Sequence, residues 1–452
     1  MAAVIDKNEI LYLSYYDIDR LGKTCKYKDH IFRIVKNNKR QEFENLLASQ
    51  FYHELVQQKL IVPVNINNDF IYDNDHFLIE SRYIPFISQP DTWSFSMLKD
   101  AAALVLKILI LCEKYDYNLI DGHPWNILFD YGSPVWCDLG SFEKKADLRQ
   151  PVSGTMEFLR TIYWPLSLWS KGHDYLANLI LGDCNYSRLL FTEHPRICQR
   201  FRAWVTLPFR LINKILSFFV VKKLLKGDIF FYRILLKKVS RLHVSGKDTT
   251  FWSNYQSDFF DQSEENMKRF INISNLVKTH CKGISCSIDL AGNQGELTKF
   301  LLSKNLIDWG VSLDYDLGAV DRLYCFVREK KLPIYPACCN IIDYEEIECG
   351  RKKAKYKADL VLATAITHHL ILTQKIPVDL IFSAIAQYSD KYVLIEFMPL
   401  GLWDGHFAPP VPDWYTEEWF HNRFSSHFKF IARQQIEPNR IVYLGELLPP
   451  NI

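Results

Sequence analysis

The stretch 286-CSIDLAGNQGELTKFLL-302 decides the fold of the C-terminal half. An apolar β-run ends at Asp289, a loop of small residues follows, and a helix begins near Glu296. Glycine in such a loop permits backbone dihedrals that larger residues avoid, and it lets a ligand approach the main chain closely. The loop residues are Ala291, Gly292, Asn293 and Gly295. This strand-loop-helix pattern predicts the first βα unit of a nucleotide-binding sheet.

A second acidic residue follows the loop at a suitable distance. About 25 residues further on, the stretch "GVSLDYD" ends a β-run at Asp314. A carboxylate in that position can accept hydrogen bonds from both ribose hydroxyls of a bound nucleoside. The loop and the acid together predict a nucleoside site. The alternative is an ordinary βαβ turn in which the acid only caps a helix.

Further apolar runs extend this pattern through the C-terminal half. Helical stretches separate them, which is typical of a doubly wound, mostly parallel sheet. We therefore expect an α/β domain over residues 249–452. The strand candidates are Ser287 to Leu290, Gly310 to Leu313, Asp359 to Ala363 and Tyr392 to Phe397.

Four stretches carry a resemblance to a known family. The residues "DLAGNQG", "SLDYD", "DLVLATAITHHL" and "VLIEFMP" resemble motifs of class I S-adenosylmethionine-dependent methyltransferases, with Ala291 and Asn293 in place of two glycines common in the loop. More closely, the whole chain resembles a group of bacterial methyltransferases called nodulation-protein-like, through "PFISQPDTWSFSMLKDAA", "FWSNYQSDFF" and "ATAITHHLIL". The resemblance implies a Rossmann-like methyltransferase domain that binds S-adenosyl-L-methionine.

The resemblance also implies roles for individual residues. Ala291 and Asn293 would belong to the cofactor-binding loop. Asp289, Gly292 and Gly295 would line the methionine and ribose part of the cofactor, Asp314 would hold the ribose, and Asn340 in "CCNIID" would face the adenine amine.

Catalytic candidates lie where the predicted strands end. His368 and His369 follow the strand candidate at 359–363, and Glu396 lies at the end of the candidate at 392–397. Parallel sheets bind substrate at the carboxyl ends of their strands. Methyl transfer to oxygen needs an aligned nucleophile and often a base for its proton, and histidine suits that task near neutral pH. The alternative is that one histidine packs at a helix start while the other only forms a hydrogen bond.

The N-terminal half has a different pattern. Short β-rich runs, such as Ile31 to Val35 and Phe77 to Tyr83, alternate with the helical stretches Glu42 to Leu60 and Trp93 to Glu113. We expect an α+β domain over residues 1–150.

A hairpin in this half, 119-LIDGHPWNILFDYGSPVWCDLGS-141, brings polar side chains together. Ile127 to Phe129 and Pro134 to Cys137 are predicted strands, so Asn126 and Asp138 should lie side by side at one end. The pattern resembles the catalytic and metal-binding loops of the protein-kinase and aminoglycoside-phosphotransferase fold. The resemblance implies that Asp121 orients a hydroxyl, while Asn126 and Asp138 hold Mg²⁺ beside ATP.

Other parts of a kinase are missing from the sequence. Leu119 stands where a histidine usually precedes the catalytic aspartate, and no glycine-rich phosphate loop is evident near the N-terminus. The expected strand lysine is either Lys36 or is replaced by Arg33. The alternative interpretation is that Asp121, Asn126 and Asp138 only cap turns in a domain that binds no nucleotide.

A helical, basic connector is predicted over residues 151–248, where it would complete the kinase-like lobe. Residues 200–245 hold eleven Lys or Arg against one acid, Asp228. Ile212, Ile215, Leu216 and Phe219 fall on one helical face. Such a helix suits the surface of an anionic membrane, and it suits an interdomain contact equally well.

Composition bounds these interpretations. The 452 residues favour two domains, and a net charge of +2 with 48% hydrophobic residues argues against general nucleic-acid binding. Eleven cysteines without a CxxC pair favour a reducing, cytoplasmic setting, with peripheral contact at the inner membrane face if the connector binds lipid. The charged N-terminus does not resemble a signal peptide, and the apolar run from Ala101 to Cys112, interrupted by Lys107, is too short to span a bilayer.

Three functions remain open. The preferred one is a methyltransferase that acts on a glycan or small molecule, with a kinase-like accessory domain. The second is a bifunctional enzyme that phosphorylates and then methylates its acceptor, by analogy with kinase-methyltransferases that cap bacterial surface polysaccharides. The third is a non-catalytic scaffold with two degenerate nucleotide folds. The acceptor and the oligomeric state are not predicted.

Overall fold

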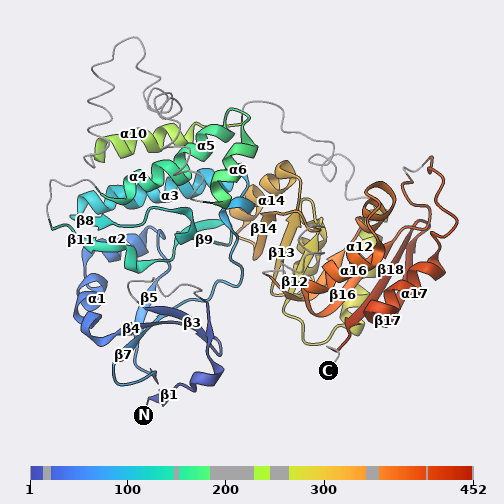
Figure 1. The fold of residues 1–452 in the computed structure, drawn as a ribbon, viewed down its shortest axis with the longest axis horizontal. Coiled ribbons are helices and arrows are strands. Elements are labelled where there is room, and N and C mark those ends of the chain that lie inside the picture. The colour runs from blue at the N-terminus through green and yellow to red at the C-terminus, as the bar shows by residue number, and fades with distance from the viewer. Residues whose placement is uncertain are drawn as a thin grey trace, which may run out of the picture. The chain divides into compact units, whose positions relative to one another are not determined.

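The computed structural model describes residues 2–13, 22–146, 152–183, 229–244, 264–342, 356–403 and 406–449, without the side chains of 264–266. The chain forms two compact units (Figure 1). The first comprises Met1–Asp91 and Met97–Gly246, and the second comprises Thr92–Ser96 and Lys247–Ile452. The stretch "FWSNYQSDFF" and the helical prediction at 212–219 lie outside the described residues. In the part that is described, no helix is both long and apolar enough to span a bilayer.

The first unit opens with an antiparallel sheet of five strands. Its order is β2 (Leu11–Tyr12), β3 (Lys23–Tyr27), β4 (His30–Lys36), β7 (His76–Ser81) and β5 (Val64–Asn67). The short strands β1 (Ala3–Val4) and β6 (Phe70–Ile71) pair separately. Helices α1 (Arg40–Leu47) and α2 (Gln50–Gln57) follow β4. The sequence predicts one helix here, and Ser49 divides it because its hydroxyl accepts the N–H of Tyr52 and starts a new helix.

Beyond β7, the described residues of the first unit are mainly helical. The long helix α3 (Phe95–Lys114) is followed by two small antiparallel pairs, β8 (Tyr117–Leu119) with β11 (Phe142–Lys144), and β9 (Ile127–Asp130) with β10 (Ser133–Trp136). The helices that follow are α4 (Gly154–Phe158), the π-helix η6 (Leu159–Tyr163), α5 (Trp164–Trp169), α6 (Asp174–Gly182) and α10 (Ile229–Ser240). Short 3-10 turns are Lys7–Glu9, Asn37–Lys39, Pro90–Thr92, Pro124–Asn126 and Leu139–Ser141.

The second unit is built on a sheet of seven strands (Figure 1). Its order is β14 (Ile334–Cys338), β13 (Trp309–Asp314), β12 (Cys286–Leu290), β15 (Ala358–Ala363), β16 (Ser389–Phe397), β18 (Arg440–Leu447) and β17 (Phe428–Glu437). The first five strands are parallel, and β18 runs antiparallel to both of its neighbours. The mixed α/β class and the mostly parallel sheet agree with the prediction from the sequence.

Helices pack on both faces of this sheet. They are α12 (Glu264–His280), α13 (Glu296–Ser303), α14 (Leu317–Lys330), the π-helix η8 (His369–Thr373), α16 (Val378–Gln387) and α17 (Glu417–His427). One core cluster joins α12 and α13 to alternate residues of the strands, including Leu362, Leu394 and Val442. Side chains alternate along a strand, so Phe397 and Tyr443 point to the opposite face, where they pack with Phe420 of α17.

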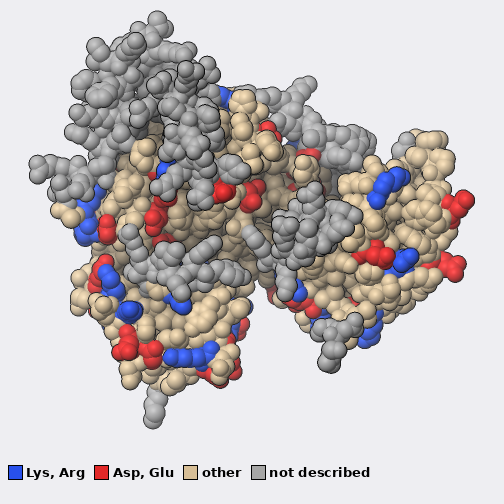
Figure 2. Space-filling model, viewed as in Figure 1, with Lys and Arg blue, Asp and Glu red and all other residues tan. Residues whose placement is uncertain are grey.

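The surface of the described residues carries both signs of charge. In the view of Figure 2, lysine and arginine are interspersed with aspartate and glutamate over the described parts of both units.

Candidate functional site

The carboxyl end of the parallel sheet gathers the predicted site residues of the second unit. Strand β12 has β13 on one side and β15 on the other, so the chain reverses its winding direction there. In open α/β sheets, ligands bind outside the carboxyl ends of the strands at this switch point. Asp289, Asp314 and Glu396 lie at the ends of β12, β13 and β16, and His368 follows β15.

The loop after β12 is tightly folded. Ala291 and Asn293 have φ angles of 57° and 51°, and Gly295 has a φ of 71°. These positive values are unusual for alanine and easier for asparagine and glycine, so Ala291 stores backbone strain. A Cβ at Gly292 would lie 2.4 Å from Ser312 Oγ and 2.9 Å from Asp289 Cγ. The loop therefore needs glycine at 292 in order to pack against the ends of β12 and β13.

Asp289 is buried beneath this loop. Its Oδ2 accepts a hydrogen bond from Thr298 Oγ1 at 3.2 Å, while Oδ1 is buried and has no hydrogen-bond partner among the described residues. Burial raises the pKa of Asp289 to about 7, and the nearby carboxylate of Asp314 adds to the rise. A buried acceptor of this kind is satisfied by a donor that a ligand brings.

Asp314 ties the end of β13 to the loop that follows β12. Its Oδ2 accepts the N–H of Asn293 at 2.7 Å, and its Oδ1 accepts the N–H of Asp316 at 2.8 Å. Burial raises its pKa, and these backbone donors oppose the rise. Each carboxylate oxygen can accept a further hydrogen bond, so Asp314 retains capacity for two hydroxyls.

Asn340 lies close to this group along the same edge. It is exposed and follows the carboxyl end of β14. The N–H of Cys339 donates to the carbonyl of Asp314 at 2.9 Å, which holds the segment leading to Asn340 beside the end of β13.

His368 and His369 start the π-helix η8 with their rings 4.1 Å apart. Single π-type turns inside helices are frequent at functional sites. His368 is buried, and its Nδ1 has no hydrogen-bond partner in the described part of the chain. Burial, together with His369, lowers the pKa of His368 to about 3, and burial also lowers the pKa of His369. Both imidazoles are consequently neutral at physiological pH.

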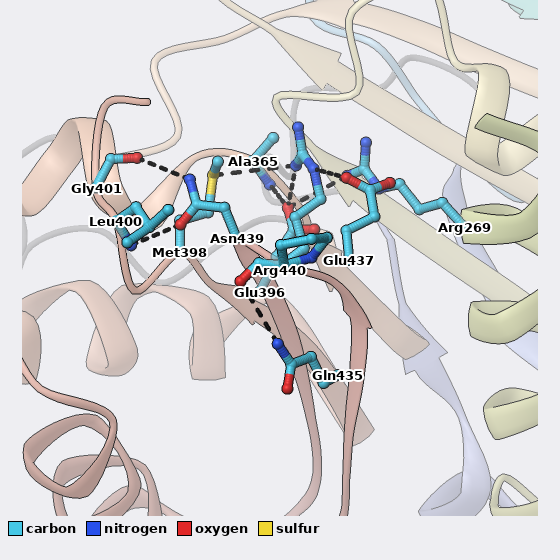
Figure 3. A network of polar contacts seen from close by, with 11 residues as sticks. Arg269, Ala365, Glu396, Met398, Leu400, Gly401, Gln435, Glu437, Asn439 and Arg440 are labelled. Atoms are coloured by element: carbon cyan, nitrogen blue, oxygen red, sulfur yellow. Dashed lines mark hydrogen bonds and ion pairs between the residues drawn. The ribbon is translucent and has the colours of Figure 1, made fainter. Parts of the chain in front are cut away.

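Glu396 is the centre of a buried polar network (Figure 3). Its Oε2 accepts hydrogen bonds from the N–H of Ala365 at 2.6 Å, from Arg440 Nη1 at 2.9 Å and from Arg269 Nη2 at 3.2 Å. Burial opposes ionisation, but the charges of Arg269 and Arg440 hold the pKa of Glu396 below its usual value. The geometry thus favours a structural anion at this position over a base that faces the acceptor.

The network contains residues that the sequence does not point to. Arg269 comes from α12, and Arg440 begins β18 and also pairs with Glu437. Ala365 has a φ of 56°, a strained value that its hydrogen bond to Glu396 helps to maintain. These partners lie 127, 44 and 31 positions from Glu396, so no local sequence pattern could identify them.

In the first unit, the hairpin residues also come together. Asn126 Nδ2 lies 3.4 Å from the carbonyl of Asp121 and 3.4 Å from Ser141 Oγ, and Ser141 donates to Oδ2 of Asp138. Arg33 Nη1 donates to Oδ1 of Asp138 at 2.7 Å. Burial of Asp138 opposes its ionisation, yet the charge of Arg33 and the hydrogen bond from Ser141 hold the pKa of Asp138 below its usual value. Arg33, one of the two cations that the sequence suggests, is therefore the one paired with Asp138.

Among the described residues, acidic, sulfur and imidazole side chains do not form a ready metal site. Within the ranges that the structure describes, no three His, Cys, Asp or Glu side chains are grouped in a way that could hold a metal ion. A site in the first unit would depend on Asn126, Asp138 and the ligands that the nucleotide supplies.

Comparisons with known proteins place the chain near a nodulation protein. No protein-family model matches it. Two solved structures similar to it are an S-adenosylmethionine-dependent methyltransferase from Clostridium acetobutylicum ATCC 824 (TM-score 0.32, 14% identity, 43% of this chain and 96% of that one) and the N-methyltransferase NodS from Bradyrhizobium japonicum WM9 (TM-score 0.31, 13% identity, 41% and 98%). The chain is 23% identical to nodulation protein NoeA of Rhizobium meliloti (strain 1021) over 407 residues, which cover 84% of this chain and 83% of NoeA.

Proposed function

We propose that the second unit binds S-adenosylmethionine and transfers its methyl group to a hydroxyl of a glycan or small-molecule acceptor. One observation carries the proposal. Asp289, the strained loop at 291–295 and Asp314 are joined at the switch point of a parallel sheet, and Asp289 keeps a buried oxygen without a hydrogen-bond partner among the described residues. This is the arrangement that a nucleoside with a cationic amino-acid arm would complete.

The residues fit such a cofactor in chemical type. The amino group of the methionine arm would donate to Oδ1 of Asp289, and the ribose hydroxyls would donate to Asp314. Asn340, exposed at the same edge, would face the adenine amine. Arg269 acts electrostatically on Asp289, Glu396 and His368, so its guanidinium is suited to hold the carboxylate of the same arm.

The chemistry requires an aligned acceptor and a place for its proton. The bound cofactor supplies an electrophilic methyl group, and the chain must orient the nucleophile and exclude water. His369 is the less buried of the two histidines, and its neutral imidazole can accept the proton of the acceptor hydroxyl. His368 packs against it and fixes its orientation.

Glu396 has a positioning role: it holds the loop before the histidines and does not contact the acceptor. It anchors the backbone at Ala365, between the end of β15 and the histidines, to α12 and to the start of β18. Thr367 Oγ1 donates to the carbonyl of Glu396 at 2.6 Å and holds the same turn. The loop that leads to His368 is consequently fixed at both of its ends.

Titration of the full chain with S-adenosylmethionine tests the cofactor site. Asp314→Ala removes the ribose acceptor, and an unmet buried hydrogen bond costs about 1 to 3 kcal/mol, so binding should weaken by roughly 5- to 150-fold. Asp390→Ala is the matched control, because Asp390 is an exposed acid at the opposite end of the sheet that pairs with Lys357. Equal affinity of wild type and Asp314→Ala contradicts the assignment.

A second candidate function is nucleotide binding by the first unit. Asn126 Nδ2 lies 3.4 Å from the main-chain carbonyl of Asp121 and 3.4 Å from Ser141 Oγ, and Ser141 donates to Asp138, which supports a kinase-like metal site at Asn126 and Asp138. The pairing of Asp138 with Arg33 favours weak binding of Mg²⁺-ATP with little phosphoryl transfer. Phosphorylated product from labelled ATP that disappears in Asp121→Ala would instead establish a bifunctional kinase-methyltransferase.

The cellular setting is part of the proposal. None of the cysteines that the structure describes is in a disulfide, and four of them are buried, which suits the reducing cytoplasm. A scaffold without catalysis becomes the better description if the protein binds neither S-adenosylmethionine nor Mg²⁺-ATP in separate titrations.

A further inference from the structure

One face of helix α10 is buried in the first unit. Tyr232, Leu235 and Val239 are at most 5% exposed, and their spacing of three or four positions puts them on the same side of the helix. The hydroxyl of Tyr232 shares a hydrogen bond with Thr155 Oγ1 of α4 at 2.6 Å. The helix is therefore held against the unit by both apolar packing and a polar contact.

The opposite face of α10 carries apolar and cationic side chains together. Phe230 is 63% exposed and Ile234 is 42% exposed. Arg233 and Lys237 are exposed on the same side of the helix, and the exposed Arg241 continues that side one turn later. Residues 229–244 contain no aspartate or glutamate. We call Phe230, Arg233, Ile234, Lys237 and Arg241 the α10 face.

Helix α6 of the same unit also exposes apolar side chains. Tyr175 is 72% exposed, and Leu176 and Leu179 are 45% and 37% exposed. Ala177 and Ile180 of this helix are buried, so the three exposed residues lie on the side that faces away from the core. The first unit thus has two helices with large apolar side chains in contact with solvent.

Lysines that border these two helices act on each other. Lys171 lies shortly before α6, and Lys238 belongs to α10. Partial burial lowers the pKa of Lys171 to about 8, and the charge of Lys238 adds to the fall. Like charges that interact in this way destabilise each other, and an anion near both would relieve the repulsion.

We propose that the α10 face, together with the exposed residues of α6, docks on the surface of an anionic membrane. A helix of this kind lies in the interface, where its apolar side chains enter the boundary between headgroups and acyl chains and its cations pair with lipid phosphates. The wider stretch 200–245 holds eleven Lys or Arg against one acid, which is a charge balance complementary to such a surface.

The two kinds of side chain together favour lipid over other partners. Nucleic acid would pair with the cations of the α10 face, but it offers Ile234 no apolar phase. An uncharged apolar partner would cover Phe230 and Ile234 and leave the cations without anions. An anionic lipid surface satisfies both requirements. The inference concerns the first unit and does not depend on the proposed methyl transfer.

Co-sedimentation of the full-length protein with lipid vesicles tests the inference. The vesicles contain phosphatidylcholine and phosphatidylglycerol in roughly equal amounts, or phosphatidylcholine alone, and the protein should sediment with the former only. Arg233→Glu combined with Lys237→Glu should weaken this partitioning by about tenfold or more, because two attractive charges become repulsive. Ile234→Ser should weaken it by about three- to tenfold, because less apolar surface is buried in the interface.

A charge-matched variant is the control. Lys59→Glu combined with Lys278→Glu reverses two exposed lysines outside α6 and α10, so it changes the net charge equally and should partition as wild type does. An equal loss in both double variants would reduce the effect to net charge and overturn the inference. A wild type that does not sediment with the mixed vesicles, or that sediments equally with the neutral ones, also overturns it.

Two further measurements test other occupants of the α10 face. A wild type that is retained on RNA but not on the mixed vesicles assigns the face to nucleic acid and overturns the inference. Ile234→Ser should melt near wild type, whereas Val239→Ser, at a buried position, should melt clearly lower. If both variants lower the melting temperature equally, the rest of the chain covers the α10 face and the inference is wrong.

Discussion

The backbone N–H of Asn293 donates to Oδ2 of Asp314 at 2.7 Å, which ties the loop after β12 to the end of β13. The loop and the end of β13, which are proposed to contact opposite ends of the cofactor, are thus linked directly by a hydrogen bond. A change at Asp314 should therefore alter the loop as well as the proposed ribose contact.

Asp289→Asn should stabilise the cofactor-free protein while it weakens S-adenosylmethionine binding. Burial raises the pKa of Asp289 from 3.8 to about 7 in the folded state. The folded protein then binds more protons at this site than the unfolded chain, so stability falls as the pH rises from about 4 to 7. Thermal melts at pH 8 should show a higher melting temperature for the asparagine variant, and calorimetry should show at least tenfold weaker binding.

Asp359→Asn provides the control of opposite sign. Burial alone would raise the pKa of Asp359. The hydrogen bonds that Ser285 and Cys286 donate to its carboxylate outweigh burial and hold this pKa below its usual value. Loss of that carboxylate should lower the melting temperature at pH 8 and leave cofactor affinity unchanged. An Asp289→Asn variant that melts below wild type at pH 8 would contradict the unfavourable burial of a charged Asp289.

Glu396→Ala should be strongly destabilising. Its carboxylate is fully buried between two arginines, and removing one partner from such a group costs about 3 to 5 kcal/mol. Glu437→Ala, which removes a more exposed partner of Arg440, should cost about 1 kcal/mol or less in urea unfolding. Because the folded pKa of Glu396 is depressed, its contribution is present above pH 4.5 and is lost as the pH falls through the folded value.

His369→Ala should lower kcat for methyl transfer by roughly 100-fold or more and leave the Kd for S-adenosylmethionine unchanged. Burial lowers the pKa of His369 below 6.5, so the acid limb of kcat should lie below pH 6.5. His368 has a pKa of about 3 and stays neutral across that range, so it should not contribute to this limb. An unaltered acid limb in His369→Gln would assign the proton to another group.

Asp138→Asn should weaken Mg²⁺-ATP binding by about tenfold or more, because Asp138 is the only carboxylate of the predicted pair of metal ligands. Asp130→Asn changes an acid of the same hairpin that pairs with Arg82, and it should have little effect. Both variants should bind S-adenosylmethionine as wild type does. Titrations with each ligand measure the two sites separately, and a wild-type protein without affinity for Mg²⁺-ATP contradicts the kinase-like assignment.

The sequence predicts the centre of the sheet well and its margins poorly. Strand β12 is buried along its whole length, so it appears as a continuous apolar run. Strand β14 is missing from the strand candidates because it contains Pro336, which a strand at the edge of a sheet tolerates. The strands β17 and β18 are also missing from the candidates, and most residues of β17 are exposed or half-buried, so it has no continuous apolar run.

The candidate site divides in the same way. The loop at 291–295 and Asp314 are close in sequence, and their chemistry follows from local pattern. The Glu396 network depends on Arg269 and Arg440, which only the folded sheet brings together. The burial of the Tyr415 hydroxyl, which has no hydrogen-bond partner among the described residues, likewise follows from packing, which residue type alone does not specify.

The position of β18 between β16 and β17 has an implication for how chains with this sheet diversify. The residues proposed to hold the cofactor, Arg269 and those between Asp289 and Asn340, all precede β16, whereas α17, β17 and β18 follow it. A recombination event after β16 would therefore exchange the last helix and the two antiparallel strands, provided that the new tail supplies a cation at the place of Arg440 beside Glu396. Chimaeras of related chains joined near residue 397 would test whether the part after β16 determines which acceptors are used.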